Sequence, residues 1–174
     1  MTGNTAPAQD PSAELTSAAV SSAIASVSFA IGNDQYCVDI MAVREIKGWT
    51  AVTHLPKQPD YVRGVLNLRG VMVPIVDLRC RFGQGLTEAT AMHVVIVVQA
   101  GSRLVGLLAD QVLDIVSFDA ADIQPVPRIA EASRVDFLSG LVTVEGQMIA
   151  LIDLPSLLSL SNVDGTSGLS AQAA

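Results

Sequence analysis

An internal repeat is the feature that most limits what this chain can fold into. Residues 61–70 align with residues 137–146 at a shift of 76, and upstream residues align at a shift of 69. In residues 61–70, half of the aligned pairs exchange one apolar residue for another and both glycines coincide, so two copies of one unit make up the body of the chain. The matching pairs include Gly32 with Gly101, Val43 with Val112, Glu45 with Asp114, Ile46 with Ile115, Gly64 with Gly140, and Gly70 with Gly146.

Each copy reads as five short strands. Runs rich in Val and Ile are separated by Gly, Asn, Asp and Pro, and the glycine-containing turns between them predict four hairpins. A copy consists of a hairpin, a strand, a loop, a second hairpin and a short helical turn, the last of which begins after Asp153 in copy two. A sheet of five short strands hides its edges most simply by curling. We therefore expect a mainly β fold of two small pseudo-symmetric barrels, built largely from residues 27–82 and 93–158.

The two ends of the chain differ from this body. Residues 1–25 and 161–174 are mostly small or polar residues, with few charges. Such segments cannot bury enough apolar surface to offset the entropy lost on ordering. We therefore predict two flexible tails around a domain at residues 26–160.

Charge and hydropathy argue against several classes of function. The net charge is −7 and the pI is about 4.6, which disfavours nucleic acid and simple electrostatic docking on anionic lipid. The apolar runs reach only five or six residues, whereas a membrane span needs about 20. Cys37 and Cys80 show no metal-ligand spacing. We expect them to be buried, reduced thiols in a cytoplasmic protein.

The chain carries no convincing catalytic set. His54 and His93 accompany neither a nucleophile motif nor a second histidine at ligand spacing, and no phosphate-binding glycine loop occurs. Asp77 and Asp153 are repeat-related and each follows an apolar strand, so a carboxylate dyad of the hydrolase type is one interpretation. The favoured interpretation is that each carboxylate caps the helical turn that follows it. The sequence thus predicts no catalytic residue, no metal and no cofactor.

The two copies expose different charges at the same turn. Arg69 occupies the turn of the second hairpin in copy one, and Glu145 occupies it in copy two. A charge in a turn is often only a solvated tip, but a guanidinium beside apolar neighbours is a common anchor for a protein partner. In residues 43–46, alternation places Val43 and Glu45 on one face and Ile46 on the other, which fits a half-buried strand or an interaction edge. The remaining candidates are surfaces, which indicates binding.

Residues 63–79, which read RGVLNLRGVMVPIVDLR, closely resemble the signature of the bacterial chemotaxis coupling proteins, the CheW-like family. The resemblance covers roughly residues 27–158. Since the chain has no room for a kinase or receiver domain, it looks like a stand-alone coupling protein. Further matches are YCVDI at 36–40, VREI at 43–46, Gly106, DQVLDI at 110–115, LSG at 138–140 and MIALIDLPSLL at 148–158.

The resemblance implies two five-stranded SH3-like barrels and a non-enzymatic adaptor that joins transmembrane chemoreceptors to the histidine kinase CheA. In this family a groove between the barrels takes the helical tip of the receptor. A cytoplasmic chain, monomeric when free, would thus be recruited to receptor arrays without entering the bilayer. An array outside chemotaxis stays an alternative, because the sequence does not name the partners. By motif position, the receptor-binding candidates are Val43, Glu45, Ile46, Gly64, Arg69, Val94 and Ile115.

The resemblance also implies a contact with the regulatory domain of the kinase, in the segment 122–129. The candidate residues there are Ile123, Gln124 and Ile129. Family members often carry Arg where Gln124 stands and an aromatic residue where Ile129 stands. A contact made by this segment would therefore use different side chains here.

Overall fold

The computed structural model of the protein describes residue 3, residues 23–127 and residues 135–159. The predicted tails fall almost wholly outside the described residues, and so does Ile129. Residues 23–25, assigned to the first tail, instead open a strand, because Ile24 packs against the interior of one sheet. No helix within the described ranges is long and apolar enough to cross a membrane.

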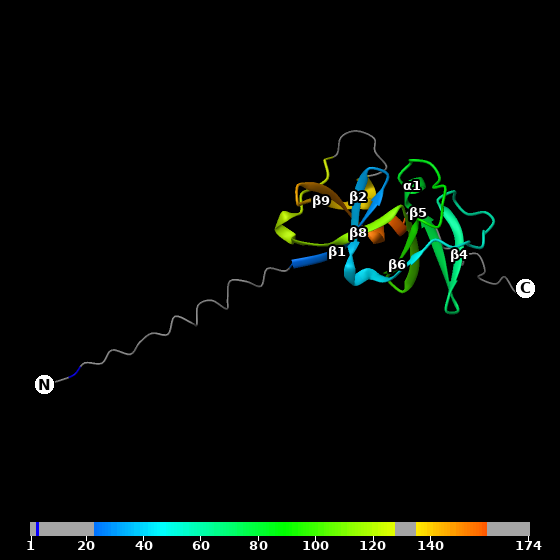
Figure 1. Ribbon diagram of the computed structural model, residues 1–174, viewed down its shortest axis with the longest axis horizontal. Coiled ribbons are helices and arrows are strands. Elements are labelled where there is room, and N and C mark those ends of the chain that lie inside the picture. The colour runs from blue at the N-terminus through cyan, green and yellow to red at the C-terminus, as the bar shows by residue number, and fades with distance from the viewer. Residues whose placement is uncertain (1–2, 4–22, 128–134, 160–174) are drawn as a thin grey trace, which may run out of the picture.

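Both copies of the repeat fold into the predicted succession of elements (Figure 1). Copy one consists of β1 (Ala23–Ile31), β2 (Asp34–Asp39), β3 (Val43–Gly48), β4 (Val62–Leu68), β5 (Val71–Asp77) and α1 (Leu78–Arg81). Copy two consists of β6 (Val94–Ala100), β7 (Arg103–Ala109), β8 (Gln111–Asp119), β9 (Leu138–Val144), β10 (Gln147–Ile152) and α2 (Leu154–Ser159). Short 3₁₀ turns lie at Ile40–Ala42, Ala120–Asp122 and Val135–Phe137. The mainly β fold is confirmed.

The strands form two five-stranded sheets that curl side by side (Figure 1). Barrel A has the order β8-β1-β2-β10-β9, and barrel B has the order β3-β6-β7-β5-β4. The sequence predicted that each barrel would come largely from one copy, but each takes three strands from one copy and the first hairpin of the other. The turn Ile40–Ala42 after β2, and the single residue Asp110 after β7, lead the chain into the other sheet. The exchanged hairpins dock through the parallel pairs β10–β2 and β5–β7.

The second hairpin of each copy turns in the same way. Arg69 and Gly70 have φ angles of 52° and 86°, and Glu145 and Gly146 have 51° and 78°. Two successive positive φ values mark a type I′ turn, whose twist matches that of the flanking strands. The side chains of Arg69 and Glu145 therefore occupy equivalent places on their barrels.

A loop residue closes each barrel against its second hairpin. Thr53 forms an isolated bridge to β4 in barrel B, and Gln124 forms one to β9 in barrel A. The repeat-related glycines at these points leave room for the loop backbone. A Cβ on Gly64 would lie 2.3 Å from the Thr53 carbonyl oxygen, and one on Gly140 would lie 3.0 Å from that of Gln124. The two glycines coincide in the repeat because each barrel closes across them.

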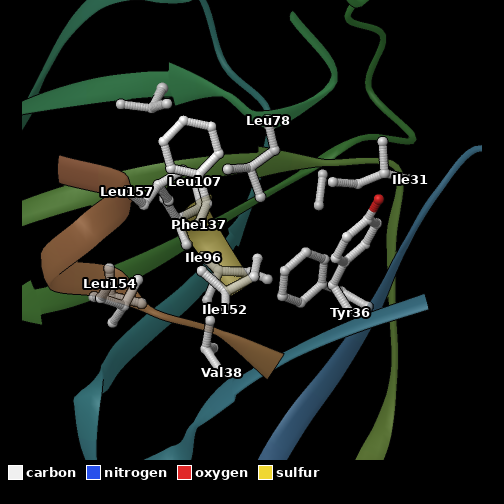
Figure 2. Packing of buried hydrophobic residues seen from close by; sticks show 14 of the residues in the cluster. Ile31, Tyr36, Val38, Leu78, Ile96, Leu107, Phe137, Ile152, Leu154 and Leu157 are labelled. Carbon is white, nitrogen blue, oxygen red and sulfur yellow. The ribbon is translucent and has the colours of Figure 1, made fainter. Parts of the chain in front are cut away.

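The largest apolar cluster lies between the barrels and not inside either one. It combines β1 and β2 residues of barrel A with residues of β5, β6 and β7 in barrel B, together with both short helices. Figure 2 shows Tyr36, Leu107 and Phe137 among its members. Smaller clusters fill the interiors of barrel B and barrel A. The centre of the seam between the barrels is thus filled by the chain's own side chains.

Candidate functional site

The sequence candidates Glu45 and Arg69 meet on the surface of barrel B. Arg69 Nη2 lies 3.2 Å from Glu45 Oε2, so the ion pair joins β3 to the turn between β4 and β5. The Arg69 side chain is 79% exposed. An ion pair this open to water stabilises the fold by at most about 1 kcal/mol. Its guanidinium remains accessible to another protein.

Exposure alternates along strand β3 as predicted, but Val43 and Glu45 do not share a face. The register shifts between them, so Val43 pairs with Val98 of the cluster between the barrels, whereas Glu45 pairs with Val97 of the barrel B interior. Ile46, on the face opposite to Glu45, is 44% exposed. Val43 packs against the cluster between the barrels. Glu45 and Ile46 therefore present their side chains to different directions, and no single flat surface takes both.

Ile115 is the candidate on barrel A. It lies on the edge strand β8, pairs with Val27 of β1 and is 59% exposed. Val112, on the same strand, packs against the cluster between the barrels, as Val43 does from barrel B. Because the centre of the seam is filled, a groove can lie only at its margin, where these two valines border the cluster.

Two receptor-binding candidates contribute to the packing of the protein rather than to its surface. Gly64 is buried, has a φ of 143° and faces the Thr53 carbonyl, so its absence of a side chain serves barrel closure. Val94 is half-buried against the cluster between the barrels. Neither contributes a prominent side chain to the surface.

The described kinase-binding candidates lie where barrel A closes. Gln124 is exposed, and its backbone exchanges two hydrogen bonds of 2.8 Å with Leu141. Ile123 is half-buried against the interior of barrel A and would meet a Cβ on Gly140 at 2.5 Å. The side chain of Gln124 is therefore the one open to a partner.

The carboxylates of Asp77 and Asp153 belong to separate local networks. Asp77 is fully buried and accepts hydrogen bonds from Thr87 N at 2.8 Å, Thr87 Oγ1 at 2.7 Å and Cys80 N at 3.3 Å. Arg63 Nη1 lies 3.3 Å from its Oδ2. Asp153 accepts a hydrogen bond of 2.7 Å from Ser156 Oγ. Asp77 is the N-cap of α1, as the favoured interpretation predicted.

A charged network at Asp110 was missed from the sequence. Asp110 Oδ2 accepts hydrogen bonds of 2.7 Å from the Gly32 amide and from Arg79 Nη2, while His93 Nε2 lies 3.6 Å from Oδ1. Thr90 N donates to His93 Nδ1 at 3.0 Å, so a neutral His93 ring carries its proton on Nε2, facing Asp110. The network joins the β1–β2 turn of barrel A to α1 and to the residue before β6 of barrel B.

A second contact between the barrels involves Arg81 of α1. Its guanidinium carbon lies 4.4 Å from the ring centroid of Tyr61 and 4.3 Å from that of Phe137, within cation–π range. These two rings are repeat-related, at the shift of 76. The repeat predicts that the two rings occupy equivalent positions, but no sequence pattern predicts that Arg81 lies between them.

The cysteines are poor nucleophiles in this structure. Burial raises the pKa of the Cys37 thiol to about 11 from a usual value of 9.0. Burial, followed by the negative charges of Asp77 and Asp60, also raises the pKa of Cys80, which is half-buried rather than buried as expected. Since the thiolate is the reactive form, both side chains are mainly protonated at neutral pH.

Comparison with known proteins identifies the family. The CheW-like domain model matches residues 25–162. A chemotaxis protein CheW of Rhizobium meliloti is 49% identical over 131 residues, which are 75% of this chain and 84% of that protein. One from Klebsiella aerogenes is 42% identical, with 75% and 79% covered. The scaffolding protein TtCheW of Thermoanaerobacter tengcongensis superposes with a TM-score of 0.71 at 29% identity, covering 78% of this chain and 87% of that one. The chain belongs to the CheW-like domain family.

Proposed function

We propose that this chain, a non-enzymatic coupling adaptor of the chemotaxis type, joins the cytoplasmic tips of chemoreceptors to the histidine kinase CheA. The observation that carries the receptor contact is the accessible Glu45–Arg69 pair beside apolar side chains on barrel B. In this proposal the free chain is cytoplasmic and monomeric, and its partners bring it to the membrane. An adaptor that holds both partners can bias kinase output with a coupling free energy of about 1–3 kcal/mol.

The receptor surface combines an apolar margin with a charged pair. Val43 and Val94 border the cluster between the barrels, and Ile46 and Ile115 project from β3 and β8. An amphipathic receptor helix can lay its apolar face along such a margin, while Arg69 fixes its register. Gly64 contributes by holding the barrel B loop in place.

The kinase contact is proposed at the closing end of barrel A. Gln124 offers an exposed amide there, and its backbone is held on β9 by the two bonds to Leu141. Ile123 supports that position from the interior, and Ile129 completes the proposed contact. Because these two bonds fix the Gln124 backbone, only its side chain has to be ordered when a partner binds, which favours a specific contact.

Co-sedimentation with receptor-containing membranes, with and without CheA, tests the proposal. Ile115→Glu should reduce the bound fraction, because a charge replaces an apolar side chain that a receptor helix would cover. Leu86→Glu is the matched control, since Leu86 is also exposed but lies in the loop after α1, outside the proposed surface. Equal binding of both variants would remove Ile115 from the receptor surface.

Arg69→Ala separates a role in docking from a role in folding. The open ion pair with Glu45 is worth at most about 1 kcal/mol, so the midpoint of thermal unfolding should stay near that of the parent chain. Receptor-dependent control of the kinase should fall. A large loss of stability, or unchanged kinase control, would contradict the proposed docking role.

A further inference from the structure

The two barrels differ at the end that carries the second hairpin's turn. Barrel A has a cavity of about 280 Å³ there. Its lining includes Ser28, Gln35, Asp114, Val144, Glu145 and Ile149. Sites for drug-sized ligands typically measure about 300–1,000 Å³. This cavity therefore suits something close to the size of one long side chain.

The repeat explains why barrel A is open at this end. The shift of 69 relates Ser28 and Gln35 to Val97 and Leu104 of barrel B. The strand register agrees, because Ser28 pairs with Asp114 as Val97 pairs with Glu45. Val97 and Leu104 both belong to the apolar cluster that fills barrel B. Shorter or polar side chains at the same positions leave the interior of barrel A less filled.

The charges at this end differ in the same way. Glu45 and Arg69 form an ion pair across barrel B, whereas Asp114 and Glu145 stand at the equivalent positions of barrel A. Both residues line the cavity. Two like charges repel, so barrel A cannot make the contact that barrel B makes within its own chain. Copy two thus has a carboxylate at the position where copy one has the cation.

We infer that the open end of barrel A is a docking site for an arginine side chain presented by a partner protein. Arg69 of barrel B is the internal precedent, because it places a guanidinium against the carboxylate that Asp114 matches. The methylenes of an incoming arginine can pack on Val144 and Ile149, which line the cavity. Its planar guanidinium can then bond to the two carboxylates at once.

The charge of the whole chain favours the same occupant. The net charge is −7, which attracts basic surfaces and repels acidic ones at low ionic strength. Ser28 Oγ already donates to the Asp114 carbonyl at 2.9 Å and accepts from its amide at 3.1 Å. These bonds hold the Asp114 backbone at the bulge of β8, so the cavity is formed before a partner arrives.

Methyl NMR of the full chain tests the inference with a defined probe. N-acetyl-L-arginine methylamide is titrated while the Val144 and Ile149 methyl resonances are followed, and the citrulline counterpart serves as the neutral isostere. Saturable shifts are expected with the arginine compound. About tenfold weaker binding is expected for citrulline, because it lacks the charge-assisted bonds. Absence of saturable shifts, or equal responses to both compounds, would overturn the inference.

Three variants locate the response. Glu145→Gln removes one carboxylate and should weaken arginine binding severalfold. Glu145→Arg places a cation opposite Asp114, as Arg69 stands opposite Glu45, and should abolish it. Glu88→Gln removes the same charge from an exposed loop residue that does not line the cavity and should bind like the parent chain. An unchanged response in either Glu145 variant, or an equal loss in the Glu88 control, would refute the assignment.

Discussion

Replacement of Gly64 by alanine tests how barrel B is closed. A Cβ at this position would lie 2.3 Å from the Thr53 carbonyl oxygen and 2.8 Å from its carbonyl carbon, both of which are backbone atoms. Neither can move aside as the end of a flexible side chain can. The φ of 143° adds strain for any residue with a Cβ. We expect Gly64→Ala to push the loop residue Thr53 away from β4.

The expected loss of stability has two parts. Backbone strain at a position that favours glycine costs about 1–3 kcal/mol. Displacing the loop breaks the bonds from Thr53 N to Val65 O at 2.9 Å and from Val65 N to Thr53 O at 2.8 Å. Each is worth about 0.5–1.5 kcal/mol, so the total loss is about 2–6 kcal/mol. At about 2–4 °C per kcal/mol, the unfolding midpoint should fall by roughly 10 °C.

Gly70→Ala is the matched control for this variant. Gly70 also has a positive φ, 86°, but nothing lies within 4 Å of a Cβ built there. It should lose only the strain term, about 1–2 kcal/mol. Urea and thermal unfolding followed by circular dichroism measure both variants. If Gly64→Ala is no less stable than Gly70→Ala, the close approach of Thr53 does not constrain the barrel and the reasoning fails.

Three further predictions concern stability. Asp77→Asn should lower the free energy of unfolding by about 2–4 kcal/mol, because the buried carboxylate accepts hydrogen bonds from Thr87 and Cys80 and faces Arg63. Urea denaturation measures this loss, and a loss smaller than that of a surface Asp→Asn variant would contradict the prediction. Lys57→Asn should raise the free energy of unfolding by about 0.5 kcal/mol, since Lys57 has a φ of 60° that asparagine adopts more easily; thermal unfolding that shows no gain would count against it. The folded-state pKa of Cys37, about 11, lies above the usual 9.0, so its contribution to stability is complete below pH 9 and is lost between pH 9 and 11. Between pH 8 and 10 the parent chain should therefore lose about 1 kcal/mol more than Cys37→Ala, and parallel pH profiles of the two proteins would refute this.

The local features of the fold were predictable, and the pairing of distant elements was not. The glycine turns and the alternation in residues 43–46 gave the hairpins and β3, because those signals lie within a few residues of one another. The same hairpin can pair with strands of either copy, since the two copies carry equivalent apolar faces. The exchange of hairpins therefore depends on tertiary packing that no local pattern reports.

The candidate site shows the same division. Glu45 and Arg69 were each marked as surface charges, but their ion pair requires a curled sheet that brings β3 to the β4–β5 turn. Asp110 was not marked, because its partners Gly32 and Arg79 lie 78 and 31 residues away along the chain. Gly64 was selected by motif position, and the structure supplies its physical role in closing the barrel.

The exchanged hairpins bear on how such a protein can arise and unfold. A single copy would contain its first hairpin, which belongs to the other barrel, and three strands of a sheet that lacks its other two strands. Two single-copy chains that traded hairpins would satisfy both deficits, as in a domain-swapped homodimer. Joining the two genes end to end would convert that dimer into a single chain with the present topology. Neither barrel could then unfold without removing strands from the other, so we expect both to unfold in one cooperative transition.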